Sequence, residues 1–348
     1  RRRSSMRASA EDRVLRAYVE AYSGEVAALR GHDVSRRQPP PYSALAHGAG
    51  GIAYMWWQLG DVHRARRWLA ALIADRRRAA YAVSGVQPPA SALLYGRAGL
   101  HWLAAATGAS TAPFVRLARR PADDVELVQG APGLLAGARL LLAHEPDAAV
   151  HAVARALAER ILARVRTRSR RPWRSTDAFG FAHGWPGALG SLLAWLAFTR
   201  EPPPRWLVAS LHRLRRAWSP RDADPRFAAS WCNGAAGTLL LWTAAFAATG
   251  DDAFLAAART AAVAALAADE QRSYVCCGRA GIAFALLSLA RHDPAERWIG
   301  HARRLAVAAA EPQPMTWPNG LYFGHPGIVC LAAQLACDRP EGFPAFER

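Results

Sequence analysis

Lysine is absent from this 348-residue chain, so all 44 of its basic side chains are arginines. They outnumber the 27 acidic residues and leave a formal net charge of +17, which attracts polyanions or acidic peptides but does not determine the fold. Charged residues make up only 20% of the chain and hydrophobic residues 52%, a composition that excludes disorder over most of its length. No run approaches the roughly 18 consecutive apolar residues of a membrane helix, so we expect no membrane span.

Features of secretion and of disulfide bonding are also missing. The basic residues at 1–3 are not followed by the apolar stretch of a signal peptide, so we expect a soluble, cytoplasmic protein of bacterial type. The first residue is Arg1 and not methionine, which fits a piece of a longer chain. Five cysteines are an odd number spread over a long chain, and they do not predict a disulfide framework. Their expected roles are metal ligand, nucleophile or buried core.

A small-residue turn of the form Gly-x-x-Gly, followed by an apolar stretch, occurs seven times. The first glycines of these turns, numbered here 1 to 7, are Gly48, Gly96, Gly130, Gly184, Gly234, Gly278 and Gly324. They lie 34 to 54 residues apart, and this period is long enough for a pair of helices. One such turn predicts no more than the start of a helix, whereas seven copies predict a repeat architecture.

The segments around the turns predict two kinds of helix. Residues after each turn, such as 188–195, are apolar on nearly every side, as in a buried helix. Segments 62–78 and 148–166 alternate apolar residues and arginines at three- and four-residue spacing, as in helices with one exposed face. We therefore predict an all-α fold, an α,α-toroid whose inner helices line the axis and whose turns gather at one rim. A basic segment and the first outer helix are expected in residues 1–40 and the toroid, as a single domain, in 41–348.

Chemically active side chains stand beside the first glycine in three of the turns. His183 directly precedes turn 4, Cys232 lies two residues before turn 5, and Cys276 and Cys277 directly precede turn 6. If the turns share a rim, these side chains converge. Three thiolate ligands with a fourth position open are the arrangement of a catalytic zinc site. The adjacent cysteine pair can also be two ordinary buried residues, and the sequence leaves both interpretations open.

These residues carry a resemblance to a known family. The motifs Ala182-His183-Gly184, Trp231-Cys232-Asn233-Gly234 and Cys276-Cys277-Gly278, together with turns spread from about residue 43 to 335, resemble the lanthionine synthetase C family. The resemblance implies a toroid of seven inner and seven outer helices with a zinc ion at one end. It also implies an enzyme that cyclises dehydrated peptides. A peptide cysteine thiol adds to the β-carbon of dehydroalanine or dehydrobutyrine and closes a lanthionine or methyllanthionine ring.

The resemblance assigns roles to five residues. Cys232, Cys276 and Cys277 would hold Zn²⁺, which keeps a substrate thiol deprotonated near neutral pH. His183 would transfer a proton, and Glu126, at a place where several relatives have an acid, would assist it in a way that stays open. Many relatives have Cys-His in place of the Cys-Cys pair, so this chain is most similar to the cyclase domains of class II lanthipeptide synthetases. Its partner would be a dehydrated precursor peptide, prepared by a separate or fused dehydratase.

Other positions differ from the family pattern or stay ambiguous. Some relatives have an arginine four residues before the first zinc cysteine, where this chain has Ala228, and Arg226 is nearby but out of register. Asn233 would either contact substrate or cap a helix. Tyr95 and Tyr322 would either contact the peptide or pack.

The remaining cysteines and histidines beside the turns are expected to be structural. Cys330 and Cys337 lie inside and after the last apolar stretch, where buried cysteine is ordinary. His47 and His325 flank turns 1 and 7, and a histidine beside a glycine turn is more often part of the packing than of a site.

Other functions stay open as hypotheses, beginning with those that the surface charge suggests. Arginine clusters at 64–67, 76–78, 164–174 and 213–216 suggest nucleic acid, but no recognisable nucleic-acid module accompanies them, so a solvated surface is favoured. Capture of an acidic leader segment of the precursor peptide is a third option. A free thiol such as glutathione could be added to dehydroamino acids in damaged proteins, or the chain could be an inactive zinc-stabilised scaffold that binds a peptide. A glycan-processing barrel would need a pair of carboxylates, which the rim motifs lack.

Overall fold

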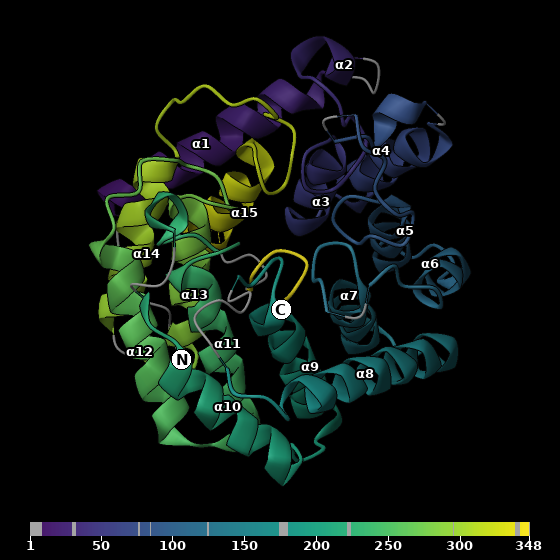
Figure 1. Cartoon of the computed structure of the whole chain (residues 1–348). Helices are drawn as coiled ribbons and strands as arrows, with labels where there is room; N and C mark the ends of the chain where they lie inside the picture. The colour runs from purple at the N-terminus through teal and green to yellow at the C-terminus, as the bar shows by residue number, and fades with distance from the viewer. Residues whose placement is uncertain are drawn as a thin grey trace, which may run out of the picture.

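A computed structural model describes residues 9–29, 33–75, 77–83, 85–123, 125–173, 180–220, 224–294, 296–337 and 342–347. Within these residues almost all regular structure is helical, and β pairing is limited to an isolated bridge between Val83 and Val86. The helices form two concentric rings around one axis (Figure 1). The predicted all-α toroid is therefore confirmed. None of the helices described is both long and apolar enough to cross a membrane.

The inner ring consists of the apolar helices that follow the seven turns. They are α3 (Gly50–Gln58), α5 (Arg97–Ala106), α7 (Ala131–His144), α9 (Trp185–Thr199), α11 (Ala235–Thr249), α13 (Arg279–Ala290) and α15 (His325–Ala336). The outer helices are α1 (Ala10–Ala27), α4 (Val62–Ala74), α6 (Ala112–Ala118), α8 (Ala148–Arg168), α10 (Arg205–Ala217), α12 (Asp252–Ala267) and α14 (Glu296–Ala309). The short helix α2 (Val34–Arg37) links α1 to turn 1. Because α15 contacts α3, the inner ring closes, and α1 packs on the last two helices, α14 and α15.

The two rings differ in composition as the apolar periodicity predicts. Most side chains of α9 and α11 are buried, whereas α4 buries one face only. Helix α4 nevertheless ends at Ala74, four residues before the predicted end at residue 78. The carboxylate of Asp75 accepts hydrogen bonds from the backbone N–H and the guanidinium of Arg77, at 3.0 and 2.8 Å. Such local side-chain bonds compete with helical ones, and the helix stops there.

A closed belt of backbone hydrogen bonds joins the seven turns at one rim. It runs through the residues two places before the first glycine of each turn, which are Ala46, Leu94, Val128, Ala182, Cys232, Cys276 and Tyr322. The N–H of each donates to the carbonyl of the next around the ring, at 2.9 to 3.4 Å, except that Leu127 replaces Val128 as the donor to Ala182. The belt places the turns in chain order around the axis. Side chains near it therefore face a shared space, as predicted for the rim.

The fourth position of each turn admits no side chain. A Cβ at Gly187 would overlap the carbonyl oxygen of Phe181, and one at Gly281 would overlap that of Val275. The inner helix therefore starts in direct contact with the loop that precedes it, and this contact requires glycine because any larger residue would push the two apart.

The chain returns to the centre of the toroid after α15. Residues 342–347 lie near the axis, where the yellow end of the chain is seen in Figure 1. The rings of Phe343 and Phe346 stack on Trp231, with centroids 5.5 and 5.8 Å away. The hydroxyl of Tyr322 donates to the carbonyl of Pro344 at 2.6 Å. This segment, here called the axial tail, thus packs directly behind the Trp231-Cys232 turn.

Replacing Phe343 by alanine should destabilise the fold by about 3–5 kcal/mol, because it empties a fully buried aromatic site in the middle of the ring. Urea denaturation followed by far-UV circular dichroism measures the change. Phe198→Ala on α9 is the matched control, since that ring is 38% exposed and its loss should cost far less. Equal effects of the two variants would mean that the axial tail contributes no packing energy.

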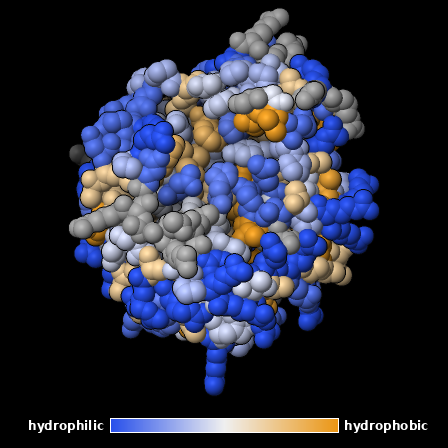
Figure 2. All heavy atoms as spheres, in the orientation of Figure 1, coloured by the Kyte–Doolittle hydropathy of each residue, from blue (hydrophilic) through white to orange (hydrophobic). Residues whose placement is uncertain are grey.

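The outer surface is mainly hydrophilic on the face drawn in Figure 2. Within the part of the chain that the structure describes, large exposed hydrophobic side chains occur singly on different elements; they are Val14, Val86, Phe198, Val263 and Ile299. Scattered exposure of this kind is ordinary for a protein surface.

Candidate metal centre

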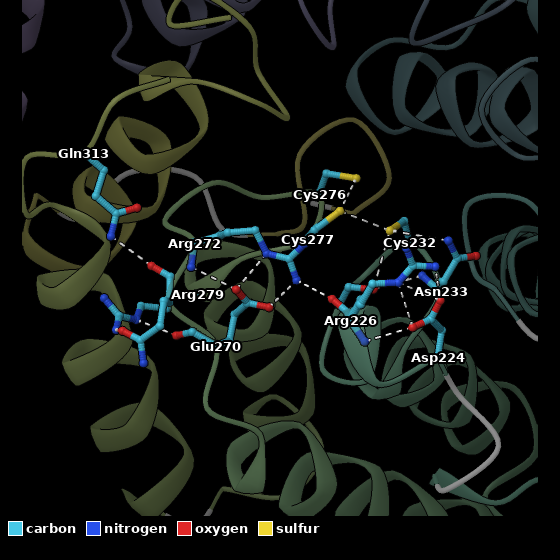
Figure 3. Close-up of polar contacts among 12 residues, drawn as sticks. Asp224, Arg226, Cys232, Asn233, Glu270, Arg272, Cys276, Cys277, Arg279 and Gln313 are labelled. Carbon is cyan, nitrogen blue, oxygen red and sulfur yellow. Dashed lines mark hydrogen bonds and ion pairs between the residues drawn. The ribbon is translucent and has the colours of Figure 1, made fainter. Parts of the chain in front are cut away.

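The three rim cysteines meet in one cluster. Cys232 comes from the loop before α11, and Cys276 and Cys277 come from the loop before α13; their Sγ atoms all lie within 4.8 Å of one another (Figure 3). The Cys232–Cys277 and Cys277–Cys276 sulfur separations are 3.3 and 3.2 Å. In a tetrahedral site with Zn–S bonds of about 2.3 Å, sulfurs lie about 3.8 Å apart, so a small outward movement accommodates the ion. The donor set fits zinc.

The pKa values of the three thiols differ. Hydrogen bonds from Cys276 and Cys277 lower the pKa of Cys232 to about 3, and the resulting thiolate raises the pKa of its two neighbours. The cluster without metal thus carries one negative charge at neutral pH. Because thiolates are the ligands, filling the site with a metal releases the remaining protons.

Polar groups beside the cluster stabilise its negative charge. The guanidinium of Arg272 counteracts the increase in the pKa of Cys277 that the neighbouring Cys232 thiolate causes. Arg272 is itself held by Glu270 at 2.6 Å and by the backbone carbonyl of Arg226 at 2.7 Å (Figure 3). The hydroxyl of Ser230 lies 3.4 Å from the Cys232 sulfur. A cation and a hydroxyl therefore stand beside the thiolates.

His183 and Glu126 form a hydrogen-bonded pair at the same rim. The Nδ1 atom of His183 lies 2.5 Å from Oε1 of Glu126, although the residues are 57 positions apart. This bond raises the pKa of His183 above its usual value, while partial burial opposes the rise and the charges of Glu126 and Cys232 add to it. The imidazole side chain is 47% exposed, so it is open to a ligand at the rim. The N–H of Ala182, the residue before His183, donates to the carbonyl of Cys232 at 3.0 Å, so the histidine lies beside a turn of the thiol cluster.

The comparisons with known proteins give the family and the fold of the chain. The sequence pattern described as "Lanthionine synthetase C-like protein" matches residues 40–347. The chain belongs to this family. A solved structure titled "Nisin cyclase" is similar with a TM-score of 0.62 over 92% of this chain and 93% of that chain, at 14% sequence identity, which supports the fold alone. No curated protein matches the sequence.

Two ambiguous residues of this lanthionine synthetase C-like chain are placed by the structure. Asn233 does not cap α11, because the cap is Gly234 and no side chain bonds there. Its Nδ2 instead lies 3.8 Å from the sulfur of Cys232. Arg226 is 80% exposed at its side chain and pairs with Asp224 at 2.7 Å. Asn233 is thus beside the thiols, whereas Arg226 contributes only its backbone carbonyl to this region.

The residues expected to be structural are buried or pack on neighbouring elements. Burial raises the pKa of Cys330 in α15, and Cys337 ends that helix. His325 accepts or donates a hydrogen bond with Tyr18 of α1 at 2.7 Å. His47 is 4% exposed among aromatic rings.

Tyr95 and Tyr322, for which the sequence left the same two roles open, have different surroundings. Tyr322 is 1% exposed and its hydroxyl is bonded to the axial tail, so it is part of the packing. Tyr95 is partly exposed and lies one residue before turn 2, the same relative position as His183 in turn 4 and Cys277 in turn 6. This shared position already distinguishes Tyr95 from Tyr322 in the sequence, because Tyr322 lies two residues before turn 7.

The arginine clusters are only partly visible, because Arg76 and Arg174 lie outside the described residues. Among the others, Arg64 pairs with Asp61 and lies over the Trp56 ring, while Arg213 donates to the carbonyl of Ser169. These arginines are occupied by contacts within the protein.

Proposed function

We propose that this protein is a zinc-dependent lanthipeptide cyclase, which forms lanthionine and methyllanthionine rings by adding peptide cysteine thiolates to dehydroalanine or dehydrobutyrine. The observation that carries the proposal is the presence of three clustered thiols and a His–Glu pair at one rim of a family toroid. The thiols suit activation of a sulfur nucleophile. The pair suits the proton transfer that the addition also needs.

Cys232, Cys276 and Cys277 would hold the zinc ion, which when bound would supply the positive charge that keeps a substrate thiol ionised near neutral pH. Asn233 and Ser230, beside the Cys232 sulfur, would orient this ligand. Arg272 would balance the excess negative charge of three thiolates.

His183 would deliver the proton that completes the reaction. Attack of sulfur on the β-carbon leaves an enolate, and a proton must reach the α-carbon. Because Glu126 holds Nδ1 and raises the pKa of the ring, His183 is protonated over a wider pH range and can donate from Nε2. Glu126 is thus a positioning residue, which fixes the tautomer and orientation of the acid.

The substrate would be a peptide in which serine or threonine has been dehydrated, so the enzyme would work after a dehydratase, either separate or fused. Reduced thiols in the protein and in the peptide favour the cytoplasm as the place of reaction.

The test is a reaction between the purified zinc-loaded protein and a synthetic peptide with one dehydroalanine and one cysteine a few residues apart. Ring closure leaves the mass unchanged but protects the cysteine from alkylation by N-ethylmaleimide, and mass spectrometry measures that protection. A parallel reaction contains glutathione and a peptide without cysteine. Protection in the first reaction supports the cyclase, and an adduct in the second reaction alone supports the glutathione alternative. The absence of both products supports the inactive binding scaffold.

A further inference from the structure

Tyr95 directly precedes turn 2, which lies across the ring from the turns that carry the cysteines. The belt runs from Ala46 through Leu94 to Val128, so turn 2 lies between turns 1 and 3. In a ring of seven, the turns opposite turn 2 are turns 5 and 6, which carry the three cysteines. A side chain directly before the glycine of turn 2 therefore faces the thiol cluster across the rim.

Aromatic packing holds the Tyr95 ring in place. Its centroid lies 5.0 Å from that of His47, which in turn stacks on Phe323 at 4.1 Å and meets Trp317 edge-on at 4.7 Å. Burial lowers the pKa of His47 to about 3, so its imidazole is neutral and cannot serve as a proton donor at neutral pH. His47 thus acts as a support for the tyrosine.

The hydroxyl of Tyr95 is available for a ligand. It forms no hydrogen bond with any residue that the structure describes, and the side chain is partly exposed. Burial raises the pKa of this phenol, and negative charge on Cys276, Glu126, Cys232 and Cys277 raises it further. The hydroxyl is therefore protonated at neutral pH. The order of the turns in the belt places Tyr95 across the rim from the cysteines.

We propose that the Tyr95 hydroxyl donates a hydrogen bond to the enolate oxygen of the substrate during ring closure. In this step a carbon–sulfur bond forms at the β-carbon and the carbon–carbon π bond breaks, and its electron pair moves onto the carbonyl oxygen. The proton for the α-carbon comes from His183, and the phenol keeps its own proton. The assignment rests on the proposed cyclase function and adds to it the group that stabilises developing negative charge.

Tyr95→Phe tests the assignment, because it removes one oxygen and preserves the ring that packs on His47. We expect kcat for ring closure to fall about 10- to 1000-fold with KM within about twofold, as for the loss of one oxyanion donor. Zinc content should be unchanged. The visible spectrum of the Co²⁺-substituted protein, and its change on adding a small thiol, should also match wild type, since sulfur binding does not involve the phenol.

Tyr322→Phe is the matched control, since its hydroxyl donates to Pro344 of the axial tail. It should lower the urea midpoint while leaving kcat within about twofold. A Tyr95→Phe protein that cyclises within twofold of wild type would overturn the assignment, and so would a loss of kcat accompanied by loss of zinc or of the thiol-induced spectral change. If wild type itself cyclises no dehydrated peptide, the proposed function fails and the role of Tyr95 fails with it.

Discussion

The Cys232→Ala protein is expected to lose bound zinc and ring closure together. Cys232 contacts the two other cysteines and is the thiol that ionises most readily in the cluster. Its removal leaves two of the three thiol ligands and takes away the one whose pKa is lowered, and two thiols are too few protein ligands to hold zinc in this site. Zinc measured by elemental analysis should fall from about one ion per chain to near zero. The rate of cyclisation should fall by at least about a thousandfold, since metal activation contributes several kcal/mol.

Cys330→Ala is the control for this experiment. It removes a buried thiol from α15 that is not part of the cluster, and the variant should keep both zinc and activity. Cys276→Ala and Cys277→Ala should behave like Cys232→Ala. Full zinc occupancy in any of the three cluster variants would show that the cluster is not the ligand set and would remove thiol activation from the proposed mechanism.

Loss of the His183 side chain, which is paired with Glu126, is expected to have the second large effect on kcat. His183→Ala should reduce kcat about 10²- to 10⁴-fold without loss of zinc, because general acid catalysis is lost while the thiols remain. His301→Ala on α14 is the matched control, since that histidine bonds to Arg304 on an outer helix. The kcat of this variant should equal that of the wild type. A wild-type kcat in His183→Ala would contradict the role of His183 as the general acid.

Glu126→Gln separates positioning from proton transfer through its pH profile. The bond with Glu126 raises the pKa of His183 in the folded protein, so the stabilisation from the pair is complete below the unfolded value near 6.5 and is lost as pH rises through the folded value. The active acid is likewise lost on the alkaline side. In Glu126→Gln the pKa of His183 should decrease, and the alkaline limb of kcat should move to lower pH. Glu145→Gln, an exposed acid after α7, should leave the limb in place; an unchanged limb in Glu126→Gln would contradict the pairing.

Much of the fold follows from local features of the sequence. Glycine at the fourth position of each turn is required by contact with the preceding loop, and an all-round apolar stretch after the turn can only be a buried helix. These constraints act within a few residues, so they are readable without the tertiary structure. The three cysteines could also be identified from their places before turns 5 and 6. The structure brings their Sγ atoms within 4.8 Å of one another.

Contacts between distant segments were decided by tertiary structure. The bond between His183 and Glu126 joins turns 4 and 3, and no local rule specifies its distance. Tyr95 and Tyr322 both lie beside glycine turns, but the ring of Tyr95 packs on His47 whereas the hydroxyl of Tyr322 bonds to the axial tail. Phe343 and Phe346 follow the last helix without any periodic pattern, yet they fill the axis behind Trp231. Local sterics and periodicity thus determine the seven helical repeats, whereas ring closure determines which side chains meet inside them.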